Sequence, residues 1–328
     1  MSLVLCGPLA GAELATWQRC LRQAMPGETL HASPELADPA EVDIALVANP
    51  APGSLRRWPA LRLIQSLWAG VDRLLADDSL PPGVPLARMV DPAMNEAMAE
   101  TALWAVLSLQ RDFFAYARQQ REGLWHQAPQ RRAADLAVSV LGLGQMGGTV
   151  ARRLMAQGYR VNAWRLHDAA PTANAATDET TSETADEAAG LAVSAGAAAL
   201  PGLLARSDVV INLLPLTAAT RGLLDARFFA ALPRGAAVVN LARGAHLVDA
   251  DLLAALDSGQ LRHAVLDVFA AEPLPAGHRY WSHPAVTLLP HVAAQTDPRS
   301  AAAVVAANVA ALRAGRPLAH LVHRARGY

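Results

Sequence analysis

Three polar side chains each follow an apolar run that has the composition of a buried strand. Arg243 follows AAVVNLA, Glu272 follows LDVFAA, and His291 follows VTLLP. Taken singly, a strand-end arginine is usually solvated, a glutamate before proline is often a turn residue, and a loop histidine is usually structural. Together they predict a site with a carboxylate anchor, an acid/base, and a carboxylate that orients and charges that acid/base.

Upstream, the stretch VLGLGQMGG has the glycine spacing of a dinucleotide-binding turn. Glycines at this spacing permit a tight turn and let a pyrophosphate approach backbone N–H groups at a helix N-terminus. A strand, a helix and a second strand are predicted in the required order around it, which makes the motif specific. The candidate cofactor residues of this turn are Gly142, Gly144, Gln145, Met146 and Gly147.

The end of the second strand of this unit bears on the choice of cofactor. An acidic residue there usually binds the ribose 2′-hydroxyl of NAD, whereas an arginine accommodates the 2′-phosphate of NADP. The chain has Arg165 at this position, and Asp168 comes three residues later. We therefore predict that NADP(H) is preferred, with NAD(H) possible because a small shift in register would bring Asp168 to the ribose.

Short apolar runs alternate with helical patterns in two series, and this alternation is typical of doubly wound parallel sheets in an α/β protein. The first series of predicted strands is 3–6, 43–48, 61–67 and 84–90, with a helix at 12–24. The second series is 136–144, 159–164, 208–215, 236–242, 263–269 and 285–291. Residues 91–123 could form one long helix whose apolar stripe is partly left for a partner chain. We expect the Ala/Thr/Glu-rich residues 168–199 to form a mobile surface excursion without assigned chemistry.

Composition excludes several classes of function. The net charge of −1 gives no electrostatic reason to expect nucleic acid or an anionic membrane. All 28 basic residues are arginine, so a P-loop, a Schiff-base lysine and a lysine general base are absent. The only cysteines, Cys6 and Cys20, form no zinc motif or disulfide framework, and we expect no metal site and a cytoplasmic location. Apolar runs are short and interrupted, so no membrane span is expected.

The motifs NLARG…VD, LDVFAAEPLP and PHVAAQT resemble the signatures of the D-isomer-specific 2-hydroxyacid dehydrogenases. LLAALDSGQL, WSHPAVTLLPHVAA and the terminal RARGY are similar to the glyoxylate/hydroxypyruvate reductase branch of that family. The resemblance covers nearly the whole chain. It implies a Rossmann NADP-binding domain, 101–289, inserted into a flavodoxin-like substrate domain made of 1–100 and 290–328.

The resemblance also implies roles for individual residues. Arg243, Glu272 and His291 match the catalytic trio, and the amides of Ala69 and Gly70 match the loop that binds the substrate carboxylate. Asp267 matches the residue that holds the nicotinamide amide. Further residues implied on the cofactor side are Leu214, Pro215, Thr220 and Ala242. Trp68 departs from the family, which commonly has a small residue there, and it could narrow the substrate pocket.

The activity that follows is NADPH-dependent reduction of small 2-oxoacids, from glyoxylate to glycolate or from hydroxypyruvate to D-glycerate. Hydride would go to C2, with His291 as the proton donor, in a homodimer formed through 91–123. Trp68 keeps open a larger 2-oxoacid substrate such as phenylpyruvate. A non-enzymatic protein that senses dinucleotides is a further alternative, which the intact Arg–Glu–His set argues against.

Overall fold

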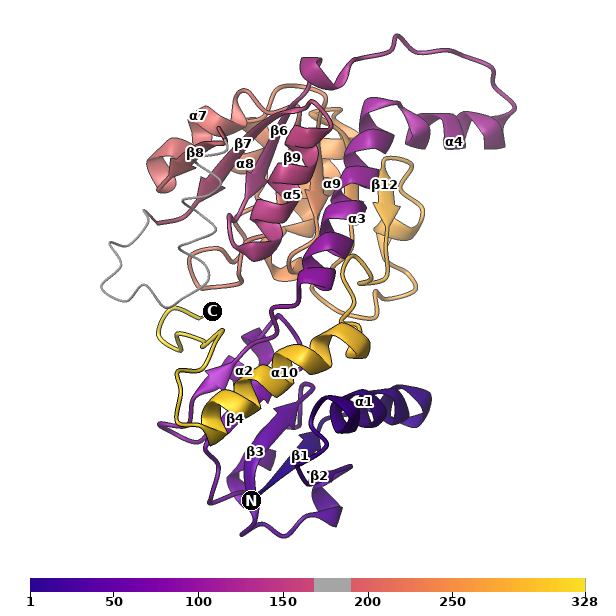
Figure 1. Ribbon diagram of the computed structural model, residues 1–328. Coiled ribbons are helices and arrows are strands. Elements are labelled where there is room, and N and C mark those ends of the chain that lie inside the picture. The colour runs from indigo at the N-terminus through magenta and orange to yellow at the C-terminus, as the bar shows by residue number, and fades with distance from the viewer. Residues whose placement is uncertain (168–189, 328) are drawn as a thin grey trace. The chain divides into compact units, whose positions relative to one another are not determined.

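The computed structural model describes residues 1–167 and 190–327, and the chain divides into two compact units (Figure 1). Unit 1 contains Met1–Met94 and the segment from Thr296 onward, and unit 2 contains the described residues from Asn95 to Gln295. The sequence predicts the two domain boundaries near residues 100 and 290. None of the helices in the described part of the chain has the length and apolarity that crossing a bilayer requires.

Unit 1 is built on a five-stranded parallel sheet. Its strands are β1 Ser2–Cys6, β2 Leu30–His31, β3 Val42–Val47, β4 Leu63–Ser66 and β5 Leu86–Ala87. Its helices are α1 Gly11–Ala24, α2 Asp72–Leu75 and α10 Pro298–Arg313. The strand order β2-β1-β3-β4-β5 is that of flavodoxin-like domains, as the sequence predicted.

Both faces of this sheet are covered. Leu3 of β1 packs with Trp17 of α1 and Val305 of α10 in one apolar cluster, while its neighbour Val4 packs with Trp58 in a second cluster. Successive strand residues point to opposite faces, so a strand that is apolar at every position must be buried on both sides. The near-continuous apolar runs of the sequence therefore encode this layered arrangement.

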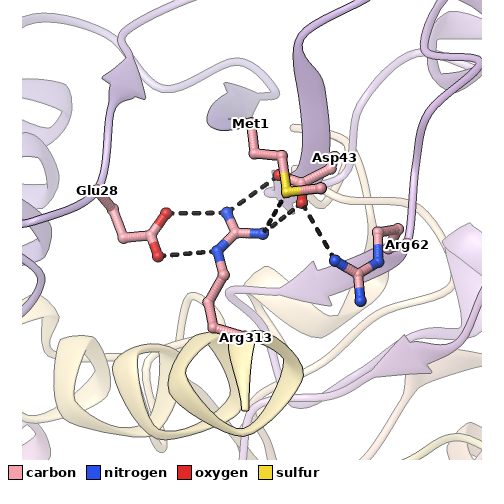
Figure 2. A network of polar contacts seen from close by, with 5 residues as sticks. All are labelled: Met1, Glu28, Asp43, Arg62 and Arg313. Atoms are coloured by element: carbon pink, nitrogen blue, oxygen red, sulfur yellow. Dashed lines mark hydrogen bonds and ion pairs between the residues drawn. The ribbon is translucent and has the colours of Figure 1, made fainter. Parts of the chain in front are cut away.

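A polar cluster joins the last helix to the start of the chain (Figure 2). The guanidinium of Arg313 in α10 donates to both carboxylate oxygens of Glu28, at 2.9 and 2.8 Å, and also to Asp43 of β3. Asp43 is 2% exposed, and Arg62 lies 3.9 Å from its carboxylate. Hydrogen bonds from Arg313 to Glu28 and Asp43 raise the pKa of Arg313. A buried carboxylate is tolerated only when it is paired in this way.

Unit 2 contains a seven-stranded parallel sheet with the order β12-β11-β10-β9-β6-β7-β8. Its strands are β6 Ala137–Leu141, β7 Arg160–Arg165, β8 Ala192–Ala195, β9 Val209–Asn212, β10 Ala236–Asn240, β11 Leu261–Leu266 and β12 Val286–Leu288. The strand order reverses between β6 and β9, which is the Rossmann pattern, and dinucleotides bind at such a reversal. This confirms the predicted α/β class.

Helices cover both faces of the second sheet. They are α3 Pro92–Gln110, α4 Phe113–Glu122, α5 Gln145–Ala156, α7 Leu200–Leu204, α8 Ala226–Ala230 and α9 Asp249–Asp257. Short 3₁₀ helices of the chain occur at Pro34–Leu36, Ser54–Arg57, Ala133–Asp135, Ala197–Ala199, Gly244–His246 and Arg279–Trp281. Apolar residues of α3 and α5 pack on one face of the sheet, and those of α7, α8 and α9 pack on the other.

Two predictions about the elements of unit 2 need correction. The helix expected over 91–123 is broken, because Asp112 has a left-handed backbone with φ 55° between α3 and α4. Arg262 donates to the oxygens of Leu109 and Asp112, at 2.9 and 3.3 Å, and so holds the break. Of the excursion predicted at 168–199, residues 168–189 lie outside the described residues, and 190–199 contain the edge strand β8.

Candidate active site

The glycine-rich turn lies between β6 and α5, where the strand order reverses. A side chain at Gly142, whose φ is 95°, would come within 2.7 Å of the carbonyl oxygen of Leu213, and one at Gly147 within 1.9 Å of the oxygen of Gly142. These two glycines are therefore required by close backbone packing. A Cβ at Gly144 would meet nothing within 4 Å, so the start of α5 is open on that side. An uncovered helix N-terminus beside a side-chain-free position fits a pyrophosphate.

The second strand of the Rossmann unit, β7, ends at Arg165. Trp164 beside it is buried, and its indole N–H donates to the carbonyl oxygen of Gly196 at 2.9 Å. The amide of Gly196 in turn donates to the oxygen of Arg165, which fixes the register of the strand end. An arginine therefore occupies the end of this strand, while Asp168 lies outside the described residues. This arrangement suits a cofactor with a 2′-phosphate.

The loop after β9 carries three of the predicted cofactor residues. Thr220 is buried, and its hydroxyl donates to the carbonyl oxygen of Pro215 at 2.7 Å and accepts from the amide of Thr217 at 2.9 Å. The amide of Leu214 donates to the side-chain oxygen of Asn212 at 3.2 Å. The loop is thus held in shape by its own polar groups at the carboxyl edge of the sheet.

Arg243 follows β10 and is half-buried, and one of its guanidinium nitrogens donates to the carbonyl oxygen of Ala242 at 2.7 Å. The next residue, Gly244, explains how its loop packs. A Cβ at Gly244 would lie 1.9 Å from the carbonyl carbon of Phe269, so only glycine fits. The Arg243 loop consequently runs directly against the segment that leads to Glu272.

Glu272 and His291 form a hydrogen-bonded pair. Nδ1 of His291 lies 2.7 Å from Oε2 of Glu272, and Oε1 of the same carboxylate accepts the amide of Phe269 at 2.9 Å. The histidine side chain is 50% exposed and the glutamate side chain 25%. Because Nδ1 is engaged by the carboxylate, Nε2 is the ring nitrogen left to exchange a proton with a ligand.

Asp267 fixes the backbone that carries His291. Its carboxylate accepts the amides of Val292 and Ala293 at 2.7 and 3.0 Å, and its carbonyl oxygen accepts the amide of His291 at 2.9 Å. His291 has φ 54°, a left-handed conformation that a non-glycine residue adopts only when its surroundings enforce it. Burial raises the pKa of Asp267, and the two amide hydrogen bonds oppose that shift.

The predicted carboxylate-binding loop of unit 1 is shaped by Ser66. Its hydroxyl accepts the amide of Trp68 at 3.0 Å and donates to the carbonyl oxygen of the same residue at 2.8 Å. The Trp68 ring packs edge-on against the buried Trp17, with ring centroids 6.2 Å apart. Among the described residues, the amides of Ala69 and Gly70 donate to no protein acceptor. These amides can therefore bind an external anion.

The family model of the D-isomer specific 2-hydroxyacid dehydrogenase NAD binding domain matches residues 103–293. A glyoxylate/hydroxypyruvate reductase A from Serratia proteamaculans is 37% identical over 333 residues, which cover 100% of each chain. The chain belongs to the D-isomer specific 2-hydroxyacid dehydrogenase family. The resemblance seen in the sequence motifs is thereby confirmed.

Two solved structures show the dehydrogenase fold over the length of this chain. A D-isomer specific 2-hydroxyacid dehydrogenase from Xanthobacter autotrophicus Py2, in complex with NADPH and MES, has a TM-score of 0.88 at 39% identity and covers 100% of this chain and 99% of its own. An NADPH-dependent glyoxylate/hydroxypyruvate reductase from Sinorhizobium meliloti, in complex with NADP and sulfate, has a TM-score of 0.87 at 34% identity, with 100% of each chain covered.

In this dehydrogenase, unit 2 holds the glycine turn, Arg165, the trio and Asp267, while unit 1 holds the Ser66–Gly70 loop. The buried residues that hold the loops of the candidate site in place were not identified from the sequence. Asn212, Asn240 and His246 are buried polar residues next to the strand ends, and Gly244 has its close contact with Phe269. In the sequence, such residues could have been recognised as polar residues that lie within or just after an apolar run.

Proposed function

We propose that the protein reduces small 2-oxoacids, glyoxylate and hydroxypyruvate, with NADPH. The observation that carries the proposal is the pair made by His291 and Glu272, 2.7 Å apart in the same unit as the glycine-rich turn. A general acid with a fixed carboxylate partner and a dinucleotide site are the two requirements of a 2-oxoacid reductase. The named activity of the relatives from Serratia and Sinorhizobium supports the same reaction.

NADPH is held by groups of unit 2. The open N-terminus of α5 at Gly144 receives the pyrophosphate, and the guanidinium of Arg165 receives the 2′-phosphate. Further contacts come from Gln145, Met146, Leu214, Pro215, Thr220 and Ala242. Asp267 keeps spare acceptor capacity beside its two amide bonds, because a carboxylate offers about four lone-pair sites. It can therefore also accept from the carboxamide of the nicotinamide.

Side chains of the protein supply a positive charge and a proton to the reaction. When bound, NADPH supplies a hydride to C2 of the oxoacid. Arg243 binds the substrate with its planar fork and stabilises the negative charge that grows on the carbonyl oxygen. Nε2 of His291 donates a proton to that oxygen, while Glu272 holds Nδ1 and fixes the direction of the ring.

Unit 1 is the substrate domain, corresponding to the predicted 1–100 plus 290–328, and unit 2 is the NADP-binding domain, corresponding to 101–289. The amides of Ala69 and Gly70 bind the substrate carboxylate. Trp68 bears on substrate choice through the shape of this loop, because its ring is packed against Trp17. The two free cysteines support a cytoplasmic location, where thiols stay reduced.

The decisive experiment measures initial rates with NADPH and NADH against glyoxylate, hydroxypyruvate and phenylpyruvate. We expect turnover of the two small oxoacids, with kcat/KM for NADPH above that for NADH. Replacing Arg165 with serine should raise the KM for NADPH about 10-fold or more, because a charge-assisted hydrogen bond is lost, and leave the KM for NADH nearly unchanged. Preference for phenylpyruvate would overturn the substrate assignment, and tight NADPH binding without turnover of any oxoacid would favour a sensing role.

We also propose a homodimer through residues 91–123, as expected from the sequence, and we extend the proposed contact to the segment that follows. Figure 1 shows α4 and the next residues extending away from the sheet of unit 2. This arm exposes large apolar side chains, with Phe113 50%, Leu124 57% and Trp125 94% exposed. Exposed apolar surface of this kind marks an interaction site. Sedimentation or light scattering should give twice the chain mass of 34.5 kDa. Trp125→Ser should shift the protein toward monomer, whereas Trp281→Ser, which alters an exposed tryptophan outside the arm, should not.

A further inference from the structure

We infer that His246 is a positioning residue that couples the binding of the dinucleotide to the binding of the oxoacid. The inference rests on the proposed function, because it takes the loop after β9 as part of the NADPH site and Arg243 as the oxoacid anchor. His246 touches neither of these ligands in the proposal. It acts through the backbone of the two loops.

The imidazole of His246 lies between the two loops and is fully buried. Its Nδ1 lies 3.1 Å from the carbonyl oxygen of Arg243, and its Nε2 lies 3.2 Å from the carbonyl oxygen of Pro215. Carbonyl oxygens only accept hydrogen bonds, so a neutral ring donates to one of them and a protonated ring to both. The protonated imidazole thus bridges the two carbonyl oxygens, and it does so beside main-chain hydrogen bonds that also join the two loops, from Gly222 to Ala245 and from Leu224 to His246, each 2.9 Å long.

A second polar chain closes the connection from the other side. The side-chain amide of Asn240 donates to the same carbonyl oxygen of Arg243 at 3.1 Å. Asn240 in turn accepts from the amide of Asn212 at 3.0 Å, and Asn212 accepts from the backbone amide of Leu214 at 3.2 Å. The two asparagines are buried at the ends of β9 and β10. Together with His246 they form a closed polar ring that runs through both loops.

This closed set of hydrogen bonds has a consequence for ligand binding. The backbone of Arg243 cannot shift unless Pro215 or the histidine also shifts, because buried polar groups that lose their partners are costly. A ligand that fixes the loop after β9 therefore also fixes the base of the Arg243 side chain. An oxoacid then binds to an anchor that is already ordered, so each ligand tightens the binding of the other by the same factor.

The coupling can be measured without catalysis. Oxamate, a 2-oxoacid analogue whose amide carbonyl resists hydride, is titrated into the protein by calorimetry with and without saturating NADPH. The ratio of its two dissociation constants is the coupling factor. The test variants are His246→Phe, which removes both ring nitrogens at similar volume, and His246→Gln, which keeps one donor. The matched control is His263→Gln, which replaces another buried histidine of unit 2 that hydrogen-bonds to Thr287 rather than to either loop.

The His246 variants should fold, because neither carbonyl oxygen is left without a donor. Pro215 still accepts from the hydroxyl of Thr220 at 2.7 Å, and Arg243 still accepts from Asn240. In the wild type we expect NADPH to tighten oxamate binding about 5-fold or more. His246→Phe should lower the factor to about half of the wild-type value or less, with the remainder carried by the chain through Asn240 and Asn212, which this variant leaves in place. His246→Gln should give an intermediate value, and the control should keep the wild-type value.

Three outcomes overturn the inference. A folded His246→Phe protein with the wild-type coupling factor would show that the ring does not transmit the effect. Loss of folding in both His246 variants would show that the residue supports the fold instead. A wild type that reduces glyoxylate but binds oxamate and NADPH independently would remove the coupling and leave the proposed reaction standing. Failure of the wild type to reduce any oxoacid would instead refute the proposed function itself.

Discussion

His291 and Glu272 are joined at 2.7 Å, and the far oxygen of the same carboxylate is held by the backbone amide of Phe269. The direction of the imidazole is therefore set by the main chain through one glutamate. Because Asp267 separately fixes the backbone of His291, the ring is held at both ends. If His291 is the acid/base, as we propose, a ring positioned in this way needs little reorganisation when the substrate arrives.

Replacing His291 with alanine removes the proposed proton donor and leaves the glycine-rich turn untouched. We expect kcat for glyoxylate to fall about 10²–10⁴-fold, the usual contribution of one general acid. The dissociation constant of NADPH, measured by its fluorescence, should stay within about 2-fold of the wild type, because the change lies outside the dinucleotide turn. Wild-type turnover by this variant would refute the assignment of His291.

Replacing Arg243 with lysine keeps the charge and removes the planar fork. We expect kcat/KM for glyoxylate to fall about 10²–10³-fold, as when one donor to a developing oxyanion is lost. Arg227→Lys, at an exposed position of α8, is the matched control and should behave as the wild type. Equal kinetics for the two lysine variants would contradict the proposed role of the guanidinium.

Replacing Gly244 with alanine tests the packing behind Arg243. The added Cβ would lie 1.9 Å from the carbonyl carbon of Phe269, so one of the two loops must move. We expect the free energy of unfolding to fall about 1–3 kcal/mol and kcat to fall with it. The control is Gly202→Ala in α7, where a Cβ meets nothing within 4 Å. That change should be neutral or stabilise the protein by up to about 1 kcal/mol.

The buried His263 makes stability depend on pH. Burial lowers the pKa of its imidazole to about 4, from an ordinary value of 6.5. Between these two values the unfolded chain binds a proton that the folded chain does not, so the free energy of unfolding falls as the pH drops from 6.5 to 4. The loss is about 3 kcal/mol in total and levels off below pH 4. Urea unfolding of His263→Gln should show a shallower slope in this window, and an unchanged slope would contradict the prediction.

Much of the fold follows from local patterns. Apolar runs such as VVIN and AVSVL became buried strands, and the glycine spacing at Gly142 placed the dinucleotide turn correctly between a strand and a helix. Arg243, Glu272 and His291 were predicted as a set because parallel strands bring their carboxyl ends to one edge of a sheet, and their catalytic roles stay predictions. A charged or polar residue directly after an apolar run can therefore be recognised from sequence alone as a candidate site residue.

The features that escaped prediction depend on partners far along the chain. The helix break at Asp112 is held by Arg262, 150 residues later. His246 has meaning only because Pro215, 31 residues earlier, faces the same ring. The edge strands β2 and β8 are two and four residues long, too short to show a period of their own. Tertiary contacts decide such features, and local propensity does not contain them.

The ion cluster around Arg313 affects the order in which the two units can fold during synthesis. Glu28 and Asp43 leave the ribosome early, but their partner lies in the last helix, beyond the whole of unit 2. At about 5–20 residues per second, the roughly 270 residues between Asp43 and Arg313 take on the order of 10–50 s to synthesise. Unit 2 is made between the two parts of unit 1 and can fold first, whereas unit 1 stays incomplete, with the Asp43 carboxylate lacking Arg313, until α10 has been synthesised. The order of biogenesis is thus the reverse of the order in which the two units begin.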